Sequence, residues 1–358
     1  MALHVRGVVL PDDEVRDLYL VGDRVTLRPE PGAETVSAEG YVVPGLVDAH
    51  CHIGIGHGGV PVESADQARD AAMVDRATGV LAIRDAGSPY PYPELDDDPE
   101  MPRLARAGRH LAPPKKHLRG IPLEVTADEV VAAAAEQARA GNGWIKLVAD
   151  WLDRGAADLA PCYDEATTRA VINVAHDAGV RVAAHTFSED AVATLVRAGV
   201  DSVEHGTGLS LDLIDEMARN GTALVPTMIN IGTFQNIAQQ AEAKFPRYAQ
   251  HLRDLHLRFP SVVRAAYEAG VPIRVGTDAG GTIAHGVIAD ELLLLHQAGM
   301  SPVDALAAGS WNAREWLGFP GLVEGGLADL VVYPEDPRKD LEVVRAPTRI
   351  VLRGRVIR

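Results

Sequence analysis

Eight short apolar runs alternate with longer stretches of helical periodicity through the middle of this chain. This alternation limits the folds that the chain can adopt more than any other feature of the sequence. Each run is short enough to be a buried strand. Strands that alternate with helices are typical of βα units in a parallel sheet. The third run is the least regular and is placed mainly by its spacing. The eight predicted strands are residues 41–49, 79–84, 103–111, 143–149, 179–184, 200–204, 222–228 and 271–277.

Helix start and stop signals recur in phase with these strands. Thr126 followed by Glu129 matches a capping box and predicts a helix over 127–140, while Ser301-Pro302 combines an N-cap with a proline at the first helical position. Further N-caps are predicted at Asp164, Ser188 and Ser210. Glycines suited to a left-handed C-cap follow the predicted helices at Gly141, Gly179, Gly199, Gly221 and Gly270.

Eight consecutive βα units predict an α/β fold, a (β/α)8 TIM barrel. An open doubly wound sheet is the alternative, but no glycine-rich phosphate-binding loop follows any predicted strand. The two chain ends carry short alternating strands, and neither has enough of them for a stable sheet. We therefore expect one small β-sandwich domain from residues 1–43 plus 323–358, and a barrel over 44–322. Residues 229–262 form a long helical insertion, interpreted as a lid-like segment or a surface excursion.

Composition excludes several classes of protein. The chain of 358 residues has 34 basic and 50 acidic side chains, a net charge of −16, which argues against a nucleic-acid partner. No run approaches about 20 apolar residues, so no membrane-spanning segment is predicted. Two cysteines, Cys51 and Cys162, make no disulfide framework and suit a reducing cytoplasm. We expect a cytoplasmic protein with a small-molecule substrate, and a homo-oligomer is compatible with the insertion.

Polar residues cluster at the predicted C-terminal ends of the strands, where barrel enzymes have their active sites. His50 and His52 end the first strand, and their spacing of two points both imidazoles to one face. Lys146 lies inside the apolar run of the fourth strand. The fifth, sixth and eighth strands end in His185, His205 and Asp278. A single histidine at a strand end is often a core residue whose hydrogen bonds are satisfied. The occurrence of all six residues together therefore points to a metal site.

Lys146 is the unusual member of this set. A buried ammonium costs several kcal/mol unless it is paired, and neighbouring histidines and a metal would raise that cost. After carboxylation by carbon dioxide, the same side chain would be an anionic carbamate whose two oxygens can bridge two divalent ions. Two ions, the carbamate, Asp278 and a bridging hydroxide would together leave one positive charge to polarise a carbonyl. The alternative is an ordinary ion pair of Lys146 with Asp150 or Asp85.

Together with Lys146 and His185, several motifs resemble the amidohydrolase superfamily over nearly the whole chain. They are GLVDAHCH (45–52), VEHGTGLS (203–210), GTDAGG (276–281), SPVDALAAGSWNAREWLG (301–318) and GGLADLVVY (325–333). The chain is most similar to the imidazolonepropionase-related branch, which includes Xaa-Pro dipeptidases with a lysine on the fourth strand.

The resemblance implies a ligand set for two zinc ions. His50, His52 and Asp278 would bind one ion, His185 and His205 the other, and N-carboxylated Lys146 would bridge them. Asp278 would also act as the catalytic proton shuttle. Imidazole ligands suit zinc, but manganese, cobalt or iron could occupy the same site.

Three functions are compared. The first is a binuclear hydrolase that cleaves an amide, peptide or lactam C–N bond with a metal-bridging hydroxide, on a dipeptide or N-acyl amino acid. The second is a mononuclear deaminase or an imidazolonepropionase-like cyclic amide hydrolase. Such deaminases usually have a glutamate just after the fifth-strand histidine, whereas Glu189 lies four residues beyond His185. The third, a non-catalytic scaffold, is disfavoured because all six ligands are present.

Three other histidines are candidate substrate contacts, and each has an ordinary alternative. They are His57 after the first strand, His117 in a basic run over 115–119, and His285 after the eighth strand. A polar loop, a solvated basic face and a helix cap are the respective alternatives. Arg84 and Asp85 are expected to form a structural ion pair, and Cys51 to pack in the core. Two aromatic residues within reach of a pocket are Trp151 and Tyr163.

Overall fold

Parallel strands occupy the middle of the molecule in two sheets. The computed structural model describes residues 2–358. In the first sheet, β9 (Val80–Asp85) lies between β6 (Leu46–Cys51) and β10 (Arg103–Arg106). The second sheet has the order β12-β11-β13-β16-β17-β18, with β11 (Leu111–Ala112), β12 (Leu123–Glu124), β13 (Trp144–Val148), β16 (Arg181–Thr186), β17 (Ser202–His205) and β18 (Ala223–Val225).

The third and eighth predicted strands are wrong in detail. Residues 103–111 do not form one strand, because the chain turns at Gly108, with φ +66°, between β10 and β11. Residues 271–277 form only one isolated bridge, between Ile273 and Leu224. The backbone of this segment still forms hydrogen bonds with Leu224 of β18 and with Ala49 of β6. The Ala49 amide donates to the Val275 carbonyl at 2.7 Å. The alternation of strands and helices is present, but residues 2–358 form no single closed ladder of eight regular strands.

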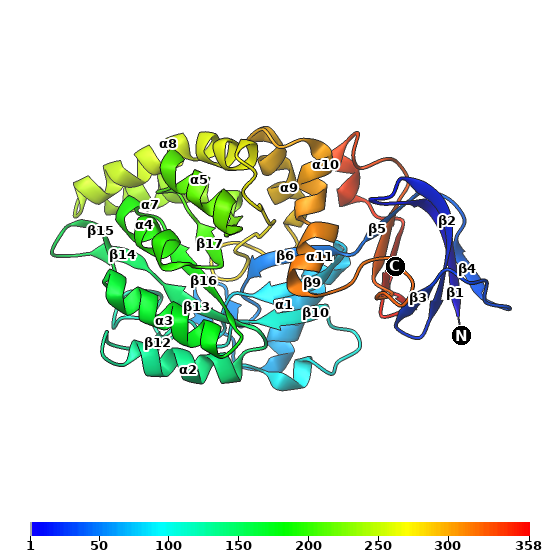
Figure 1. The fold of residues 1–358 in the computed structure, drawn as a ribbon, viewed down its shortest axis with the longest axis horizontal. Helices are drawn as coiled ribbons and strands as arrows, with labels where there is room; N and C mark the ends of the chain where they lie inside the picture. The colour runs from blue at the N-terminus through cyan, green and yellow to red at the C-terminus, as the bar shows by residue number, and fades with distance from the viewer. Residues whose placement is uncertain (1) are drawn as a thin grey trace.

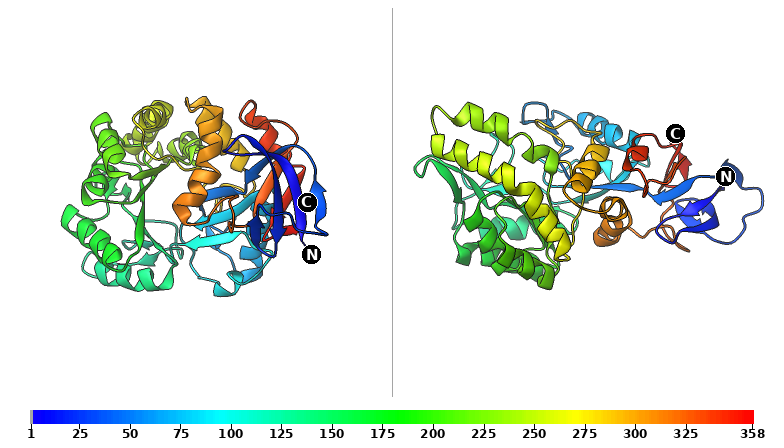
Figure 2. Two further views of the ribbon diagram at one scale, coloured as in Figure 1. Left: turned by 45° about the vertical axis from the view of Figure 1, so that its right-hand side comes forward. Right: turned by 90° about the horizontal axis from the view of Figure 1, so that it is seen from above.

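Helices cover the outer faces of these sheets (Figures 1 and 2). They are α1 (Ala65–Ala77), α2 (Val130–Ala140), α3 (Glu165–Asp177), α4 (Glu189–Ala198), α5 (Leu211–Asn220), α9 (Ile288–Gln297), α10 (Pro302–Ala308) and α11 (Trp311–Leu317). Within residues 2–358, no helix combines the length and the apolar character needed to cross a lipid bilayer. Short 3₁₀ helices occur at η1 (Pro93–Leu95) and η2 (Leu341–Arg345).

Most of the predicted helix caps are confirmed. The side chains of Asp164, Ser188 and Ser301 accept a backbone N–H from the first turn of their helices. Ser210 occupies an N-cap position but accepts no such bond. The helix after Thr126 begins at residue 130 rather than 127, because residues 127–129 form a turn before it.

Gly199 and Gly221 are left-handed C-caps, and Gly179 and Gly270 have positive φ just after their helices. Gly141 is different, because its backbone is extended at φ −83°. A Cβ there would lie 2.7 Å from two backbone carbonyls. Glycine at this position therefore permits a close approach between chain segments instead of a left-handed cap.

Both chain ends contribute to one eight-stranded sheet, as expected, at the right of Figure 1. β5 (Tyr41–Pro44) lies between β1 (Leu3–Val9) and β19 (Leu330–Tyr333). All of these strands pair within a single sheet, so a β-sandwich of two sheets is not confirmed. The predicted domain boundaries stay predictions. The remaining strands of this sheet are β2 (Glu14–Val21), β3 (Arg24–Thr26), β4 (Glu34–Ser37), β20 (Arg349–Leu352) and β21 (Arg355–Val356).

The predicted insertion at 229–262 is helical. It spans most of α6 (Met228–Ile231), all of α7 (Phe234–Ala241) and the first part of α8 (Pro246–Glu268). Two antiparallel hairpins lie elsewhere in the chain, formed by β14 (Asp150–Asp153) with β15 (Asp158–Pro161), and by β7 (Ile55–Gly56) with β8 (Val60–Pro61).

An ion cluster joins α8 to the rest of the molecule. His251 Nδ1 lies 2.8 Å from Asp158 of β15, and its Nε2 lies 3.1 Å from Glu189 of α4. Arg258 also pairs with Glu189, at 2.6 Å. These contacts hold α8 against the hairpin and α4. Movement of the segment as a lid stays a prediction.

This cluster predicts a pH-dependent contribution to stability. Its hydrogen bond to Glu189 raises the pKa of His251 to about 9. A raised histidine pKa means that the contribution is fully present below about pH 6.5 and is lost as the pH rises through 9. We expect His251→Gln to lower the melting temperature at pH 6 and to have little effect at pH 9.5, measured by circular dichroism.

The control for this variant is His57→Gln, because His57 is exposed. It should leave the melting temperature unchanged at both pH values. An equal loss of stability for His251→Gln at pH 6 and pH 9.5 would show that the ionised histidine is not what fastens α8.

Candidate metal centre

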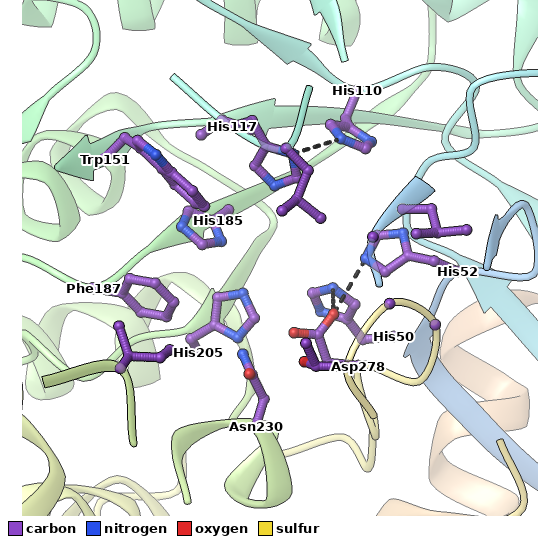
Figure 3. A pocket seen from close by; sticks show the side chains of 18 of the residues that line it. His50, His52, His110, His117, Trp151, His185, Phe187, His205, Asn230 and Asp278 are labelled. Atoms are coloured by element: carbon purple, nitrogen blue, oxygen red, sulfur yellow. Dashed lines mark hydrogen bonds and ion pairs between the residues drawn. The ribbon is translucent and has the colours of Figure 1, made fainter. Parts of the chain in front are cut away.

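His50, His52 and Asp278 form a compact group of possible metal ligands (Figure 3). Asp278 Oδ1 lies 3.3 Å from His50 Nε2 and 3.2 Å from His52 Nε2. The Asp278 amide donates to the His50 carbonyl at 2.7 Å, which fixes the backbone of Asp278 beside β6. His52 Nδ1 is 2.8 Å from the Gly87 carbonyl, so its Nε2 is the nitrogen free to bind an ion. Two imidazoles and a carboxylate suit zinc or a related divalent ion.

His185 and His205 lie beside this group at the ends of β16 and β17. Their ring centroids are 4.7 Å apart, and the His205 ring is 5.2 Å from that of His50. His205 Nδ1 is 2.7 Å from Thr227 Oγ1, which leaves its Nε2 available. His185 Nε2 is buried without a hydrogen-bond partner. All six predicted ligands line one cavity, namely His50, His52, Lys146, His185, His205 and Asp278.

Lys146 is buried at the same place, and its Nζ lies 3.4 Å from His50 Nε2. Burial lowers the pKa of Lys146 to about 8. Within residues 2–358, no carboxylate lies within 4.0 Å of this ammonium, so the ion pair with Asp150 or Asp85 is not formed. Asp150 instead accepts hydrogen bonds from residues 186–188, and Asp85 accepts one from a neighbouring serine. A carbamate on Lys146 would remove this uncompensated cation.

Glu204, which sequence reasoning missed, orients His50. Its carboxylate lies 2.6 Å from His50 Nδ1 and accepts two hydrogen bonds from Arg84, at 2.6 and 2.7 Å. The expected ion pair between Arg84 and Asp85 is therefore wrong, because Arg84 points into the sheet interior towards Glu204. A charged residue inside a buried strand, directly before His205, was the available signal for this role.

The charges of the site suit a divalent cation. Burial lowers the pKa values of His185 and His205 well below the usual range, so both rings are neutral. Burial raises the pKa of Asp278, but the histidines around it, His50 foremost, hold it well below its usual value. The pKa of Glu204 is also held well below its usual value, by Arg84 foremost. Neutral imidazoles beside ionised carboxylates are the state that metal binding requires.

The cavity above these residues has a volume of about 300 Å³. Trp151 and Phe187 lie on one side of it, and α7 contributes Phe234 (Figure 3). His117 lies on the wall, with its Nδ1 3.3 Å from Nε2 of His110. Burial lowers the pKa of His117 to about 3. His110 was not identified from the sequence, because it lies in the irregular segment between β10 and β11.

The other predicted contacts lie away from this cavity. His57 is exposed and does not line the cavity, although Ile55 before it and Gly58 and Gly59 after it do. His285 binds Asp75 of α1 at 2.8 Å. Tyr163 is buried and donates to a backbone carbonyl, and Cys51 packs in the core as expected. Substrate contact by any of the three histidines stays a prediction, and His117 alone among them lines the cavity.

Comparisons with known proteins identify a family and several relatives. A model of the amidohydrolase family matches residues 41–357. An uncharacterized protein of Mycobacterium tuberculosis (strain ATCC 25618 / H37Rv) is 50% identical over 355 residues, which cover 99% of this chain and 95% of that protein. Ochratoxinase of Aspergillus niger is 29% identical over 180 residues, which cover 47% of this chain and 35% of that protein.

Solved structures match the fold over nearly the full length. A Xaa-Pro dipeptidase with bound methionine has a TM-score of 0.83 at 23% identity, covering 99% of this chain and 98% of its own. A putative prolidase from Bifidobacterium longum has a TM-score of 0.83 at 26% identity, covering 100% and 94%. With the family match, these likenesses imply an α/β TIM-barrel fold.

Because Glu204 contacts His50, a predicted metal ligand, its charge should affect metal affinity. We expect Glu204→Gln to weaken zinc binding about 10- to 100-fold, the range for loss of a ligand's hydrogen-bond partner. Competition with a chromophoric chelator measures this, at a temperature where circular dichroism shows the variant folded. Ser202→Ala is the control, since it removes one hydrogen bond to Glu204 and keeps the charge. Equal zinc affinity in Glu204→Gln and wild type would exclude this role.

Proposed function

Because the chain belongs to the amidohydrolase family, we propose that it is a metal-dependent hydrolase that cleaves the C–N bond of an amide, peptide or lactam. Family membership supports a hydrolytic enzyme acting on amide bonds. One observation supports the metal-dependent mechanism: six possible ligands from five separate segments of the chain lie around one cavity. The substrate and the number of ions belong to the proposal.

The donor set fits two zinc ions. His50, His52 and Asp278 would hold one, and His185 and His205 the other. Carboxylation of neutral Lys146 by carbon dioxide forms an N–C bond and releases one proton, and it gives a carbamate with two oxygens for the two ions. The buried ammonium of Lys146, whose Nζ lies 3.4 Å from His50 Nε2, supports this assignment. Other divalent transition metals would suit the same ligands.

Bound ions would lower the pKa of a water molecule to about 7 and polarise the substrate carbonyl. In this proposal Asp278 would take the proton of the attacking water and pass it to the leaving nitrogen. Glu204 holds His50 in one orientation and tautomer through the contact at Nδ1. The side chains of Trp151 and Phe187 line the cavity and would limit access of bulk water to the reacting groups.

The position of Glu189 argues against the deaminase alternative. This residue begins α4 and pairs with His251 and Arg258, so it is not available at the cavity for proton transfer. A scaffold without catalysis would have no need of the buried charges that hold His50. The hydrolase therefore remains the proposal. A dipeptide or N-acyl amino acid as substrate, cytoplasmic location and homo-oligomerisation remain predictions from the sequence.

The first test is metal content per chain, in protein expressed with added zinc and bicarbonate. We expect two ions in the wild type and one or fewer in Lys146→Ala, because the bridging carbamate is lost. Lys116→Ala is the control, since Lys116 pairs with Asp153 outside the cluster. One ion in both wild type and Lys146→Ala would remove the bridging role and favour a mononuclear enzyme.

The second test concerns the proton shuttle. We expect Asp278→Asn to lower kcat about 10²- to 10⁴-fold on an amide that the wild type cleaves, because an amide side chain cannot carry the proton. The metal content of the same sample must be measured, since Asp278 is also a proposed ligand. A fully loaded Asp278→Asn enzyme with wild-type kcat would assign proton transfer to another group.

A further inference from the structure

The cavity wall has almost no positive charge. Among the described residues that line it, Lys146 at the metal centre is the only lysine or arginine. The Nδ1 of His117 faces Nε2 of His110 at 3.3 Å, so this nitrogen is already occupied by a neighbouring ring. A substrate whose scissile carbonyl sits at the metal centre must place its flanking groups against this wall. A free carboxylate there would have no cation to pair with.

Two cations on the elements around the cavity are already paired with carboxylates. Lys116 of the basic run binds Asp153 of the β14–β15 hairpin at 2.6 Å. Arg247 of α8 binds Asp158 at 2.8 Å. Lys115 and Arg119 belong to the same basic run but do not line the cavity. The run therefore offers no docking site for a substrate carboxylate inside this pocket.

The wall is instead aromatic and neutral. Trp151, Phe187 and Phe234 present ring surfaces to the cavity, and Asn230 and Tyr248 are polar groups without charge. Burial of an unpaired carboxylate among such groups is costly, whereas burial of an aryl or alkyl group is favourable.

We propose that the substrate is electrically neutral where it enters this cavity, an amide with an aryl or bulky apolar group beside the scissile bond and no free carboxylate. This inference rests on the proposed hydrolase and narrows its substrate class. It departs from the dipeptide and N-acyl amino acid expected from the sequence, because both of those carry a carboxylate close to the bond that is cleaved.

A matched pair of compounds tests the charge preference on zinc-loaded protein. N-acetyl-L-phenylalanine and its methylamide share the aromatic group and the acetyl C–N bond, and only the first carries a carboxylate. We expect the methylamide to bind at least tenfold more tightly by calorimetry, and to release acetate with at least tenfold higher kcat/KM. Equal or tighter binding of the acid would overturn the inference.

A variant pair tests whether the wall sets this preference. Ile237 of α7 lines the cavity and is 37% exposed, so a longer polar side chain can be accommodated there with its end in water. Ile237→Arg should strengthen binding of the acid at least tenfold relative to Ile237→Gln, which has no charge. An unchanged preference between these two variants would contradict the inference.

Binding and turnover separate the two proposals. Preferential binding of the methylamide without acetate release would support the neutral substrate class and count against the proposed hydrolase. Acetate release from the acid with at least equal kcat/KM would support the hydrolase and reject the neutral class.

Discussion

The carboxylate of Glu204 makes the contact on which the metal centre depends. It joins three strands, because it lies on β17, binds Arg84 of β9 and contacts His50 of β6. Arg84 also packs against the rings of Trp144 and Trp316, at 4.6 and 5.0 Å from their centroids. Loss of either partner of such a fully buried ion pair would leave an uncompensated charge and would be strongly destabilising. The Arg84 Nε–H donates to the carbonyl of Ala49, which precedes His50, so Arg84 also binds the backbone of β6.

Backbone conformation at the strand ends contributes to the same geometry. His205 and Asp278 have φ of +67° and +57°, a region that costs non-glycine residues about 1–3 kcal/mol. The cost is offset by bonds such as that from the Asp278 amide to the His50 carbonyl. The chain turns sharply at both residues just where their side chains reach the cavity. This backbone arrangement would hold the proposed ligands His205 and Asp278 in place before a metal ion binds.

The sequence predicted a site residue well where a residue type that can bind a metal also lies at a recognisable strand end. His50 and His52 could be placed because their spacing and strand end are visible in the residues alone. The pairing of Arg84 with Glu204 could not be predicted, because residues 120 positions apart meet only after the sheet has formed. The break of the third strand near Gly108 was also hidden, since its apolar pattern continues on both sides. His285 looked like a site residue by position, but Asp75 holds it against α1.

The ligands and the wall of the cavity come from different parts of the chain. The strands and their ends provide the proposed ligands, while α7, α8 and the β14–β15 hairpin provide much of the wall. The ion cluster of His251 fastens α8 to that hairpin and α4 without contact to Glu204 or Arg84. Substitutions in the wall can therefore change the preferred substrate while the ligand network stays intact. A family with one catalytic centre can in this way act on substrates of different charge, because their flanking groups contact side chains that the metal chemistry does not use.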